Sequence, residues 1–332
     1  MPRRTALALL MFVALAATRP ALALPPAPPP ALERLLGQYG APGFILTIYE
    51  DKGRLYADAP TIHSSPLIRR GSGYAVELQN GQRGALDFDA GGRAQAVFLM
   101  GLRLPRRDFG AEAVAAIQAK VKADPAKVRA AALAASPPSE TGKRPADLVE
   151  LTTVDKRIRL DIRYATANNF MGFPLYERAG AYLQRPAAEA LGRVQEALAA
   201  QGYGLLIHDA YRPWFVTKMF WDATPPEDHV FVADPAQGSR HNRGCAVDLT
   251  LYDLKSGKPV EMTGRYDEMS TRSDADFVGG TSKQRALRRI LRTAMEAEGF
   301  TVYPQEWWHF DYKDWPQYAV GTATFTELAA RR

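Results

Sequence analysis

The sequence predicts an α+β protein in two parts: a small, mainly-β domain, then a larger domain with an antiparallel sheet and flanking helices. Between residues 44 and 104, short runs of β-branched and aromatic residues alternate with turn signals such as Asn80-Gly81. A segment rich in Pro, Ser and Gly follows at 136–147. Beyond it, two long amphipathic helical patterns are separated by short apolar strands, which is typical of an α+β domain.

The first residues have the pattern of a secretory signal peptide. Arg3 and Arg4 precede an apolar run, and Ala21-Leu22-Ala23 is a small-x-small cleavage motif. We expect residues 1–23 to be removed during export to the periplasm, and an uncleaved N-terminal anchor is the alternative. The chain of 332 residues carries a formal net charge of +6, and the cleavage removes three arginines and leaves +3. So mild a charge gives no support for a nucleic-acid partner.

Cysteine content adds two expectations. The chain has one cysteine, Cys245, so it folds without an internal disulfide. No cysteine lies near the predicted cleavage site, which argues against the usual lipoprotein anchor. No later run of about 18 apolar residues occurs, and we expect no stable membrane insertion after signal cleavage.

The predicted mature chain begins with a stiff, proline-rich tether at 24–30. We assign residues 31–135 to the small β domain, beginning with a short helix at 31–39 and ending with an Ala-rich helix interrupted at Pro125. The sequence gives no activity for this domain.

Residues 136–147 are the predicted linker and 148–332 the second domain. Its first long helix covers 186–201, with Pro at the first turn, and its second covers 282–298, closed by Gly299. The expected strands lie between and after these helices, around 158–162, 204–207, 247–251, 300–303 and 307–312.

Two separate motifs contain the residue types of a hydrolytic zinc centre. His241 and Asp248 occur in His-x-x-Gly-x-Ala-x-Asp, where Gly244 allows a tight turn and a close approach. Glu306 and His309 occur in Glu-Trp-Trp-His. Two imidazoles and one carboxylate can hold zinc with a fourth position open, and a nearby glutamate can act as the base.

Plainer interpretations exist for each motif. His241 and Asp248 also fit a loop and strand with a hydrogen-bonded histidine, and Cys245 between them fits a small buried residue better than a thiolate ligand. The tryptophans between Glu306 and His309 fit a core strand. In a regular strand, residues three apart face opposite sides, so Glu306 and His309 can reach one metal only if the strand bends.

Arg212 lies in the turn Tyr-Arg-Pro-Trp, where Pro213 prevents helix continuation. Its permanent charge suits an oxyanion that forms in a transition state, although a surface arginine is the alternative. The sequence contains neither His-Glu-x-x-His nor Gly-x-Ser-x-Gly, which excludes the helical zinc proteases and the serine hydrolases that use a nucleophile elbow.

Together, these motifs resemble the zinc D-Ala-D-Ala dipeptidases of the vancomycin-resistance (VanX) type over roughly 148–312. The resemblance is carried by ordered blocks, among them Asp-Ile-Arg-Tyr-Ala-Thr at 161–166, His-Asp-Ala-Tyr-Arg-Pro at 208–213, Ser239 to Asp248 and Glu-Trp-Trp-His at 306–309. Met-Thr-Gly at 262–264 departs from the family, which more often has Met-Gly, and the domain before residue 148 is a larger departure.

The resemblance implies a zinc D,D-peptidase (hedgehog-like) fold. It further implies one zinc ion per chain and a role in binding or catalysis for each candidate site residue. The implied roles are His241, Asp248 and His309 as ligands, Glu306 as base, Arg212 as stabiliser of the tetrahedral intermediate, and Tyr164, Ser239 and Asp267 as contacts for the ends of a dipeptide.

The expected function is hydrolysis of D-alanyl-D-alanine and related small D,D-dipeptides in cell-wall peptide metabolism. A D,D- or L,D-carboxypeptidase acting on peptidoglycan stem peptides is one alternative, and predicted export favours it. The blocks around Tyr164 and Asp267 favour the dipeptidase, because a site that closes on a free ammonium excludes longer chains. A non-catalytic, zinc-stabilised module that binds wall peptides is a third possibility, but a binder needs no base such as Glu306.

Overall fold

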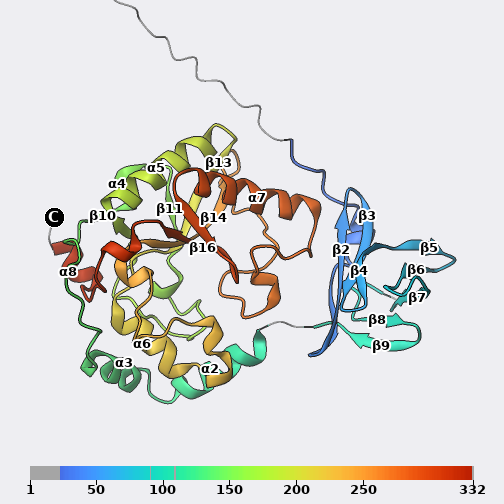
Figure 1. The fold of residues 1–332 in the computed structure, drawn as a ribbon, viewed down its shortest axis with the longest axis horizontal. Coiled ribbons are helices and arrows are strands. Elements are labelled where there is room, and N and C mark those ends of the chain that lie inside the picture. The colour runs from blue at the N-terminus through green and yellow to red at the C-terminus, as the bar shows by residue number, and fades with distance from the viewer. Residues whose placement is uncertain (1–22, 90, 108–109, 331–332) are drawn as a thin grey trace, which may run out of the picture.

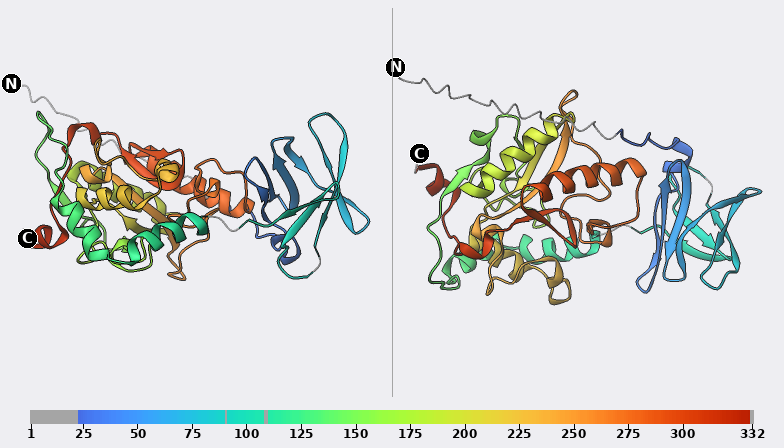
Figure 2. Two further views of the ribbon diagram at one scale, coloured as in Figure 1. Left: turned by 90° about the horizontal axis from the view of Figure 1, so that it is seen from below. Right: turned by 45° about the horizontal axis from the view of Figure 1, so that its top comes forward.

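Two bodies lie end to end in the computed structural model, which describes residues 23–89, 91–107 and 110–330 (Figure 1). Both further views keep the smaller, β-rich body at one end of the long axis (Figure 2). The predicted signal peptide falls almost entirely outside the described residues and stays a prediction. Within the described ranges, every helix is too short or too polar to cross a membrane.

The smaller body contains two antiparallel sheets around one apolar core. The first sheet has four strands, β1 (Gly37–Ala41), β2 (Phe44–Asp51), β3 (Arg54–Ala59) and β4 (Ile62–Pro66). The second has five, β5 (Ile68–Arg70), β6 (Gly73–Glu77), β7 (Arg83–Phe88), β8 (Ala96–Leu99) and β9 (Leu102–Pro105). Alternating residues such as Leu46, Ile48 and Leu86 are fully buried between them.

The helix predicted at 31–39 is wrong beyond its first turn. The helix α1 covers only Pro30–Glu33, and the chain then enters β1. Residues 37–41 pair with β2, starting at Gly37 opposite Ile48, and this pairing buries the Tyr39 side chain completely. Strand pairing therefore outweighs the weak helical pattern of this segment.

The assignment of the Ala-rich helical segment to the β domain is also corrected by the packing. It forms α2 (Ala111–Lys122) and α3 (Pro125–Ala134), with the break at the predicted proline. Ile117, Val121 and Ala132 belong to the core of the larger body, where α3 packs against α6 (Trp214–Ala223). Along the chain, the change from the smaller core to the larger one therefore falls before residue 111, and not in the linker-like segment at 136–147.

The larger body is built on a five-stranded sheet in the order β11-β13-β14-β16-β15. All neighbours are antiparallel except β11 and β13. The strands are β11 (Arg159–Leu160), β13 (Tyr203–Asp209), β14 (Ala246–Asp253), β15 (Phe300–Tyr303) and β16 (Glu306–Tyr312). The predicted α+β class and antiparallel sheet are confirmed.

Helices cover the sheet on both sides. Figure 1 shows α5 (Arg185–Ala199) and α7 (Ser282–Ala297) on one side, and α2, α3 and α6 on the other. Shorter elements complete the body: β10 (Leu148–Glu150), β12 (Tyr182–Gln184), α4 (Leu151–Val154), α8 (Phe325–Ala330) and the 3₁₀ turns η1 (Arg163–Ala165), η2 (Pro226–Phe231), η3 (His241–Arg243), η4 (Thr271–Ser273) and η5 (Trp315–Gln317). The central strands β14 and β16 carry the candidate site.

Candidate active site

Two neighbouring strands and one turn bring the predicted metal ligands together. Asp248 on β14 lies directly opposite His309 on β16 in the antiparallel register. His241 precedes β14 in η3, which ends at Gly244 with a φ of 66°. A Cβ at Gly244 would lie 2.5 Å from the Leu148 side chain, so this left-handed turn needs glycine. The turn returns the chain within seven residues and sets His241 beside Asp248.

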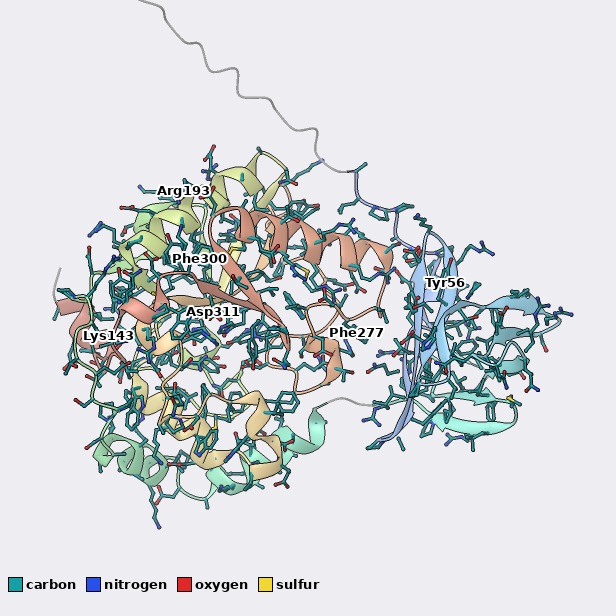
Figure 3. All side chains as sticks on the ribbon, in the orientation of Figure 1. Tyr56, Lys143, Arg193, Phe277, Phe300 and Asp311 are labelled. Atoms are coloured by element: carbon teal, nitrogen blue, oxygen red, sulfur yellow. The ribbon has the colours of Figure 1, made fainter. Side chains whose placement is uncertain are left out.

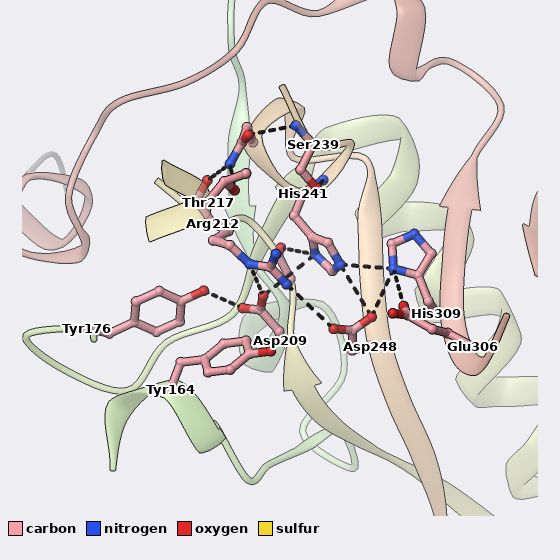
Figure 4. A network of polar contacts seen from close by, with 12 residues as sticks. Tyr164, Tyr176, Asp209, Arg212, Thr217, Ser239, His241, Asp248, Glu306 and His309 are labelled. Carbon is pink, nitrogen blue, oxygen red and sulfur yellow. Dashed lines mark hydrogen bonds and ion pairs between the residues drawn. The ribbon is translucent and has the colours of Figure 1, made fainter. Parts of the chain in front are cut away.

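The three side chains converge on one point, as Figure 4 shows. His309 Nδ1 lies 3.0 Å from His241 Nε2 and 3.1 Å from Asp248 Oδ1. His241 Nε2 is 3.3 Å from the same Asp248 oxygen. All three residues are buried, and their potential ligand atoms lie within 4.8 Å of one another. No other group of metal-binding type was found among the described residues.

The outer nitrogen of each imidazole has its own hydrogen-bond acceptor. His241 Nδ1 donates to the Ala210 carbonyl at 2.6 Å, and His309 Nε2 donates to Asp311 Oδ1 at 2.8 Å. With its outer nitrogen held in this way, each imidazole directs its inner nitrogen toward the Asp248 carboxylate, which is the orientation that a metal ligand needs. Three converging donor atoms of this kind fit a divalent cation such as zinc.

The charge balance at this point also favours a cation. Burial opposes the charged form of His309, but Asp311 and Asp248 outweigh it and raise the pKa of the imidazole to about 10. The pKa of Asp248 is held well below its usual range: burial would raise it, but His241 and His309 have the larger combined effect. The site thus attracts positive charge, and a bound metal ion would replace the inner proton of His309.

Glu306 reaches the same side of the sheet because β16 bends. Val302 pairs with Phe310, but the next residue, Tyr303, pairs with Glu306, so the register is irregular there. Glu306 Oε2 lies 3.6 Å from His309 Nδ1. The bend required by strand parity is therefore present.

The carboxyl group of Glu306 is a weaker acid than an ordinary glutamate side chain. Burial raises its pKa to about 7, with Asp248 adding to the shift and His309 and Arg212 opposing it. A carboxyl with a pKa near neutrality can both accept and release a proton under physiological conditions.

Arg212 extends into the site between β13 and α6. Its Nε donates to Asp209 Oδ2 at 2.8 Å, and its terminal nitrogen lies 3.8 Å from Asp248 Oδ2. The guanidinium stacks 4.8 Å from the Phe220 ring and 5.3 Å from the Tyr164 ring. Only 7% of the residue is exposed, so the surface alternative is wrong and its charge is fixed beside the metal ligands.

The three predicted substrate contacts lie in the walls of the same cavity. The Tyr164 hydroxyl donates to Asp267 Oδ1 at 3.0 Å, while Asp267 Oδ2 is buried without a hydrogen-bond partner within the described part of the chain. Burial, followed by the charges of Asp248 and Glu306, raises the pKa of Asp267 well above its usual range. Ser239 is also buried, and its hydroxyl accepts from the His241 backbone N–H at 3.2 Å.

These groups surround a cavity of about 420 Å³. It contains the metal-ligand triad, Glu306 and Arg212, and it extends to Tyr164, Ser239 and Asp267. Every residue that the sequence nominated for the site is thus brought to one cavity.

Sequence reasoning missed three hydrogen-bond partners of the site, of which Asp209 is buried and the other two are half-buried. Asp311 accepts from His309, Asp209 holds Arg212, and the Tyr266 hydroxyl donates to Asp248 Oδ2 at 3.1 Å. Asp311 follows His309 by two residues, so strand alternation could have predicted that both face the same side. The other two contacts depend on tertiary packing and leave no comparable pattern.

Cys245 is buried and is not among the converging ligands. Burial raises the pKa of its thiol to about 12. The prediction that this residue fills space is therefore consistent with the packing.

Comparison with known proteins identifies the family. The family model described as D-ala-D-ala dipeptidase matches residues 144–327. The chain belongs to this family. The family is one of peptidases, and the match begins close to the predicted start of the second domain. The helices α2 and α3 lie outside the matched range, although their apolar residues contribute to the same core.

Three dipeptidase-family relatives carry the same description. The D-alanyl-D-alanine dipeptidase of Escherichia coli (strain K12) is 35% identical over 165 residues, covering 50% of this chain and 84% of that protein. The Enterococcus faecium protein of that name is 37% identical over 177 residues, covering 48% and 88%. The Streptomyces coelicolor one is 36% identical over 180 residues, again covering 48% and 88%.

A solved structure of the LdcB LD-carboxypeptidase aligns with 57% of this dipeptidase-family chain and 72% of its own, at 21% identity. The TM-score of this alignment is 0.29.

Proposed function

We propose that this protein hydrolyses D-alanyl-D-alanine and related small D,D-dipeptides to free D-amino acids, using one zinc ion per chain. Family membership supports the reaction class. The observation that carries the proposal is the convergence of a His-Asp-His triad, a glutamate and a buried arginine in one cavity. The cavity is also lined by Asp267, whose buried Oδ2 has no hydrogen-bond partner among the described residues and is suited to the cationic end of a small substrate.

His241, Asp248 and His309 would hold the metal. A bound zinc ion supplies Lewis acidity, which polarises a carbonyl group and lowers the pKa of a water molecule. Asp311 and the Ala210 carbonyl keep both imidazoles oriented for this task.

Glu306 acts as the general base and then as the general acid. Its carboxylate accepts a proton from the attacking water and delivers it to the amine of the leaving D-amino acid. The pKa of about 7 suits both transfers. One water is consumed, the peptide C–N bond breaks, and two amino acids are formed.

Arg212 stabilises the oxyanion that develops on the scissile carbonyl. Its guanidinium is already desolvated and held by Asp209, so little reorganisation is needed when the negative charge appears. The two aromatic rings beneath it restrict its orientation further.

The ends of the dipeptide are bound by the cavity walls. Asp267, oriented by Tyr164, receives the free ammonium, which supplies a partner for the unbonded Asp267 oxygen and favours ionisation of the carboxyl group. The Ser239 hydroxyl contacts the carboxylate end. This pairing distinguishes a dipeptidase from a carboxypeptidase, because an acylated stem peptide has no ammonium at that position.

Release of free D-alanine tests the proposal. The zinc-loaded protein should release D-alanine from D-Ala-D-Ala, lose this activity with a chelator, and act poorly on L,D-dipeptides. N-acetyl-D-Ala-D-Ala and an acylated tripeptide test the carboxypeptidase alternative. Faster hydrolysis of these substrates than of free D-Ala-D-Ala would contradict the proposed dipeptidase activity. Binding of D-Ala-D-Ala without any release of D-alanine would instead support a non-catalytic wall-peptide module.

We also propose that the enzyme works in the periplasm, in cell-wall peptide metabolism, after removal of residues 1–23. The basis is the signal-peptide pattern of the sequence. Sequencing the N-terminus of the protein recovered from the periplasm should find Leu24 first, whereas a mature chain starting at Met1 would contradict cleavage.

A further inference from the structure

The β domain contacts the catalytic domain at the first turn of α7. The side chain of Glu50, at the end of β2, accepts from the Ser282 backbone N–H at 2.9 Å and from the Ser282 hydroxyl at 2.9 and 3.0 Å. The Glu50 backbone N–H donates to the Gly280 carbonyl at 3.1 Å. Arg285 of α7 donates to the Glu50 carbonyl at 2.7 Å and pairs with Asp51 at 3.0 Å. A buried carboxylate at the start of a 16-residue helix is electrostatically favourable.

A second set of contacts lies on the segment that precedes α7. We call residues 263–281 the wall loop. Gln38 of β1 lies with its amide nitrogen 3.3 Å from Thr271 Oγ1. A Cβ at Gly110 would lie 3.0 Å from the Met269 nitrogen, so the connection between the domains also runs against this loop. In Figure 3, Phe277 of the wall loop lies at the side of the catalytic domain that faces the β domain.

The inner side of the wall loop forms part of the catalytic cavity. Asp267, Glu268, Met269 and Ser273 all line it. The hydroxyl groups of Ser270 and Ser273 both donate to Glu268, one to its carboxylate and one to its carbonyl. These bonds tie Ser270 and Ser273 to Glu268, which is the chain neighbour of Asp267.

The Glu50 contact lies at the end of the wall loop, which returns beside its start. A Cβ added at Gly280, which accepts from Glu50, would lie 3.4 Å from the Thr263 methyl group, so the two ends of the wall loop run side by side. Thr263 Oγ1 also accepts from Arg288 of α7 at 3.1 Å. The Glu50 contact therefore lies beside Thr263, which is four positions before Asp267 and also bonds to α7.

We propose that Glu50 is a positioning residue of the active site: through it, the β domain holds the wall loop so that Asp267 faces the ammonium end of the substrate. Glu50 lies outside the range matched by the family model, which begins at residue 144. The substrate end named here rests on the proposed function, whereas the contact itself does not.

The matched variants are Glu50→Gln and Asp58→Asn. Glu50→Gln keeps the side-chain size but removes the charge and turns an amide donor toward the donors of Ser282. Asp58, on β3, accepts from the backbone and hydroxyl of Ser64 within the same domain, at 3.0 and 3.3 Å. The control therefore loosens the β domain without touching the wall loop.

The first readout needs no substrate. Amide hydrogen exchange in residues 263–281 should become faster in Glu50→Gln and stay at the wild-type rate in Asp58→Asn. Equal exchange rates in Glu50→Gln and wild type would show that the Glu50 contact does not hold the wall loop, and would overturn the proposal. If Glu50→Gln fails to fold, Ser282→Ala, which removes the hydroxyl that donates to Glu50, takes its place with the same criteria.

The second readout is kinetic. For D-Ala-D-Ala, Glu50→Gln should raise KM by about 3- to 10-fold while kcat stays within about twofold, because only ground-state positioning is lost. In an Asp267→Asn background the same change should have little further effect. An equal effect in both backgrounds, or a lowered kcat with unchanged KM, would overturn the link to Asp267. A wild-type protein that releases no D-alanine would refute the proposed function. The hydrogen-exchange result would still show whether Glu50 holds the wall loop.

Discussion

Replacement of Asp311 by Asn tests how the candidate metal centre is held together. Asp311 accepts from His309 Nε2 at 2.8 Å and lies 3.2 Å from Arg240 Nε. After burial, which opposes the effect, Asp311 is the largest influence on the pKa of His309, raising it toward about 10. The amide oxygen of Asn can still accept the hydrogen bond, but the negative charge that makes His309 a more basic ligand is lost.

The expected loss follows from this geometry. A partner that orients a ligating histidine typically contributes a factor of about 10–100 in metal affinity, or about 1.4–2.7 kcal/mol. Competition with a chromophoric zinc chelator measures the dissociation constant directly. Asp314→Asn is the matched control, since it makes the same charge change three residues away, where the side chain pairs with Arg144 at 3.8 Å.

Zinc affinity of Asp311→Asn within about twofold of the wild type would refute this reasoning. An equal loss in Asp314→Asn would point to general electrostatics and not to the oriented hydrogen bond. Thermal unfolding with and without zinc checks the same result independently, because a more weakly bound metal stabilises the folded state less.

Three further predictions concern residues around the site. Arg212→Ala should lower kcat by about 100- to 1,000-fold in steady-state kinetics, because the oxyanion loses its stabilising charge. It should also reduce the free energy of unfolding, measured by urea denaturation, by about 3–5 kcal/mol, because Asp209 is left buried without its cationic partner. Cys245, with its thiol pKa raised to about 12, should resist iodoacetamide at pH 8 in the folded protein and react after unfolding, as mass spectrometry would show. Gly244→Ala should be more destabilising than Gly53→Ala in urea denaturation, since φ is positive at both but only Gly244 has neighbours within 4 Å of the added carbon.

The sequence could nominate the residues that converge in this cavity because the motifs that carry them are local. His241 and Asp248 belong to one turn and the strand after it, and Glu306 and His309 to one strand, so residue type and spacing carry the information. The parity of Glu306 and His309 even predicted an irregular strand, which the β15–β16 register contains. Asp209 was missed because its role depends on a buried arginine and not on a repeating pattern.

The domain organisation was less predictable, for a physical reason. An Ala-rich helix has a weak apolar face, so its sequence does not specify which core it joins. Ile117 and Ala132 belong to the core of the larger body, and α2 and α3 both contact α6. The Pro-containing segment that follows them resembles a domain boundary by composition only. Similarly, residues 37–41 became a strand because β2 offered a pairing partner, which helical periodicity cannot reveal.

The most direct test of the account compares the wild type with Glu306→Gln, both loaded with zinc. Gln is close in size to Glu but cannot accept the proton of water, so D-alanine release from D-Ala-D-Ala should fall by at least about 100-fold while one zinc ion per chain remains bound. The metal content, measured on the same samples, separates loss of the base from loss of the metal. Turnover near the wild-type rate by zinc-loaded Glu306→Gln would contradict the account.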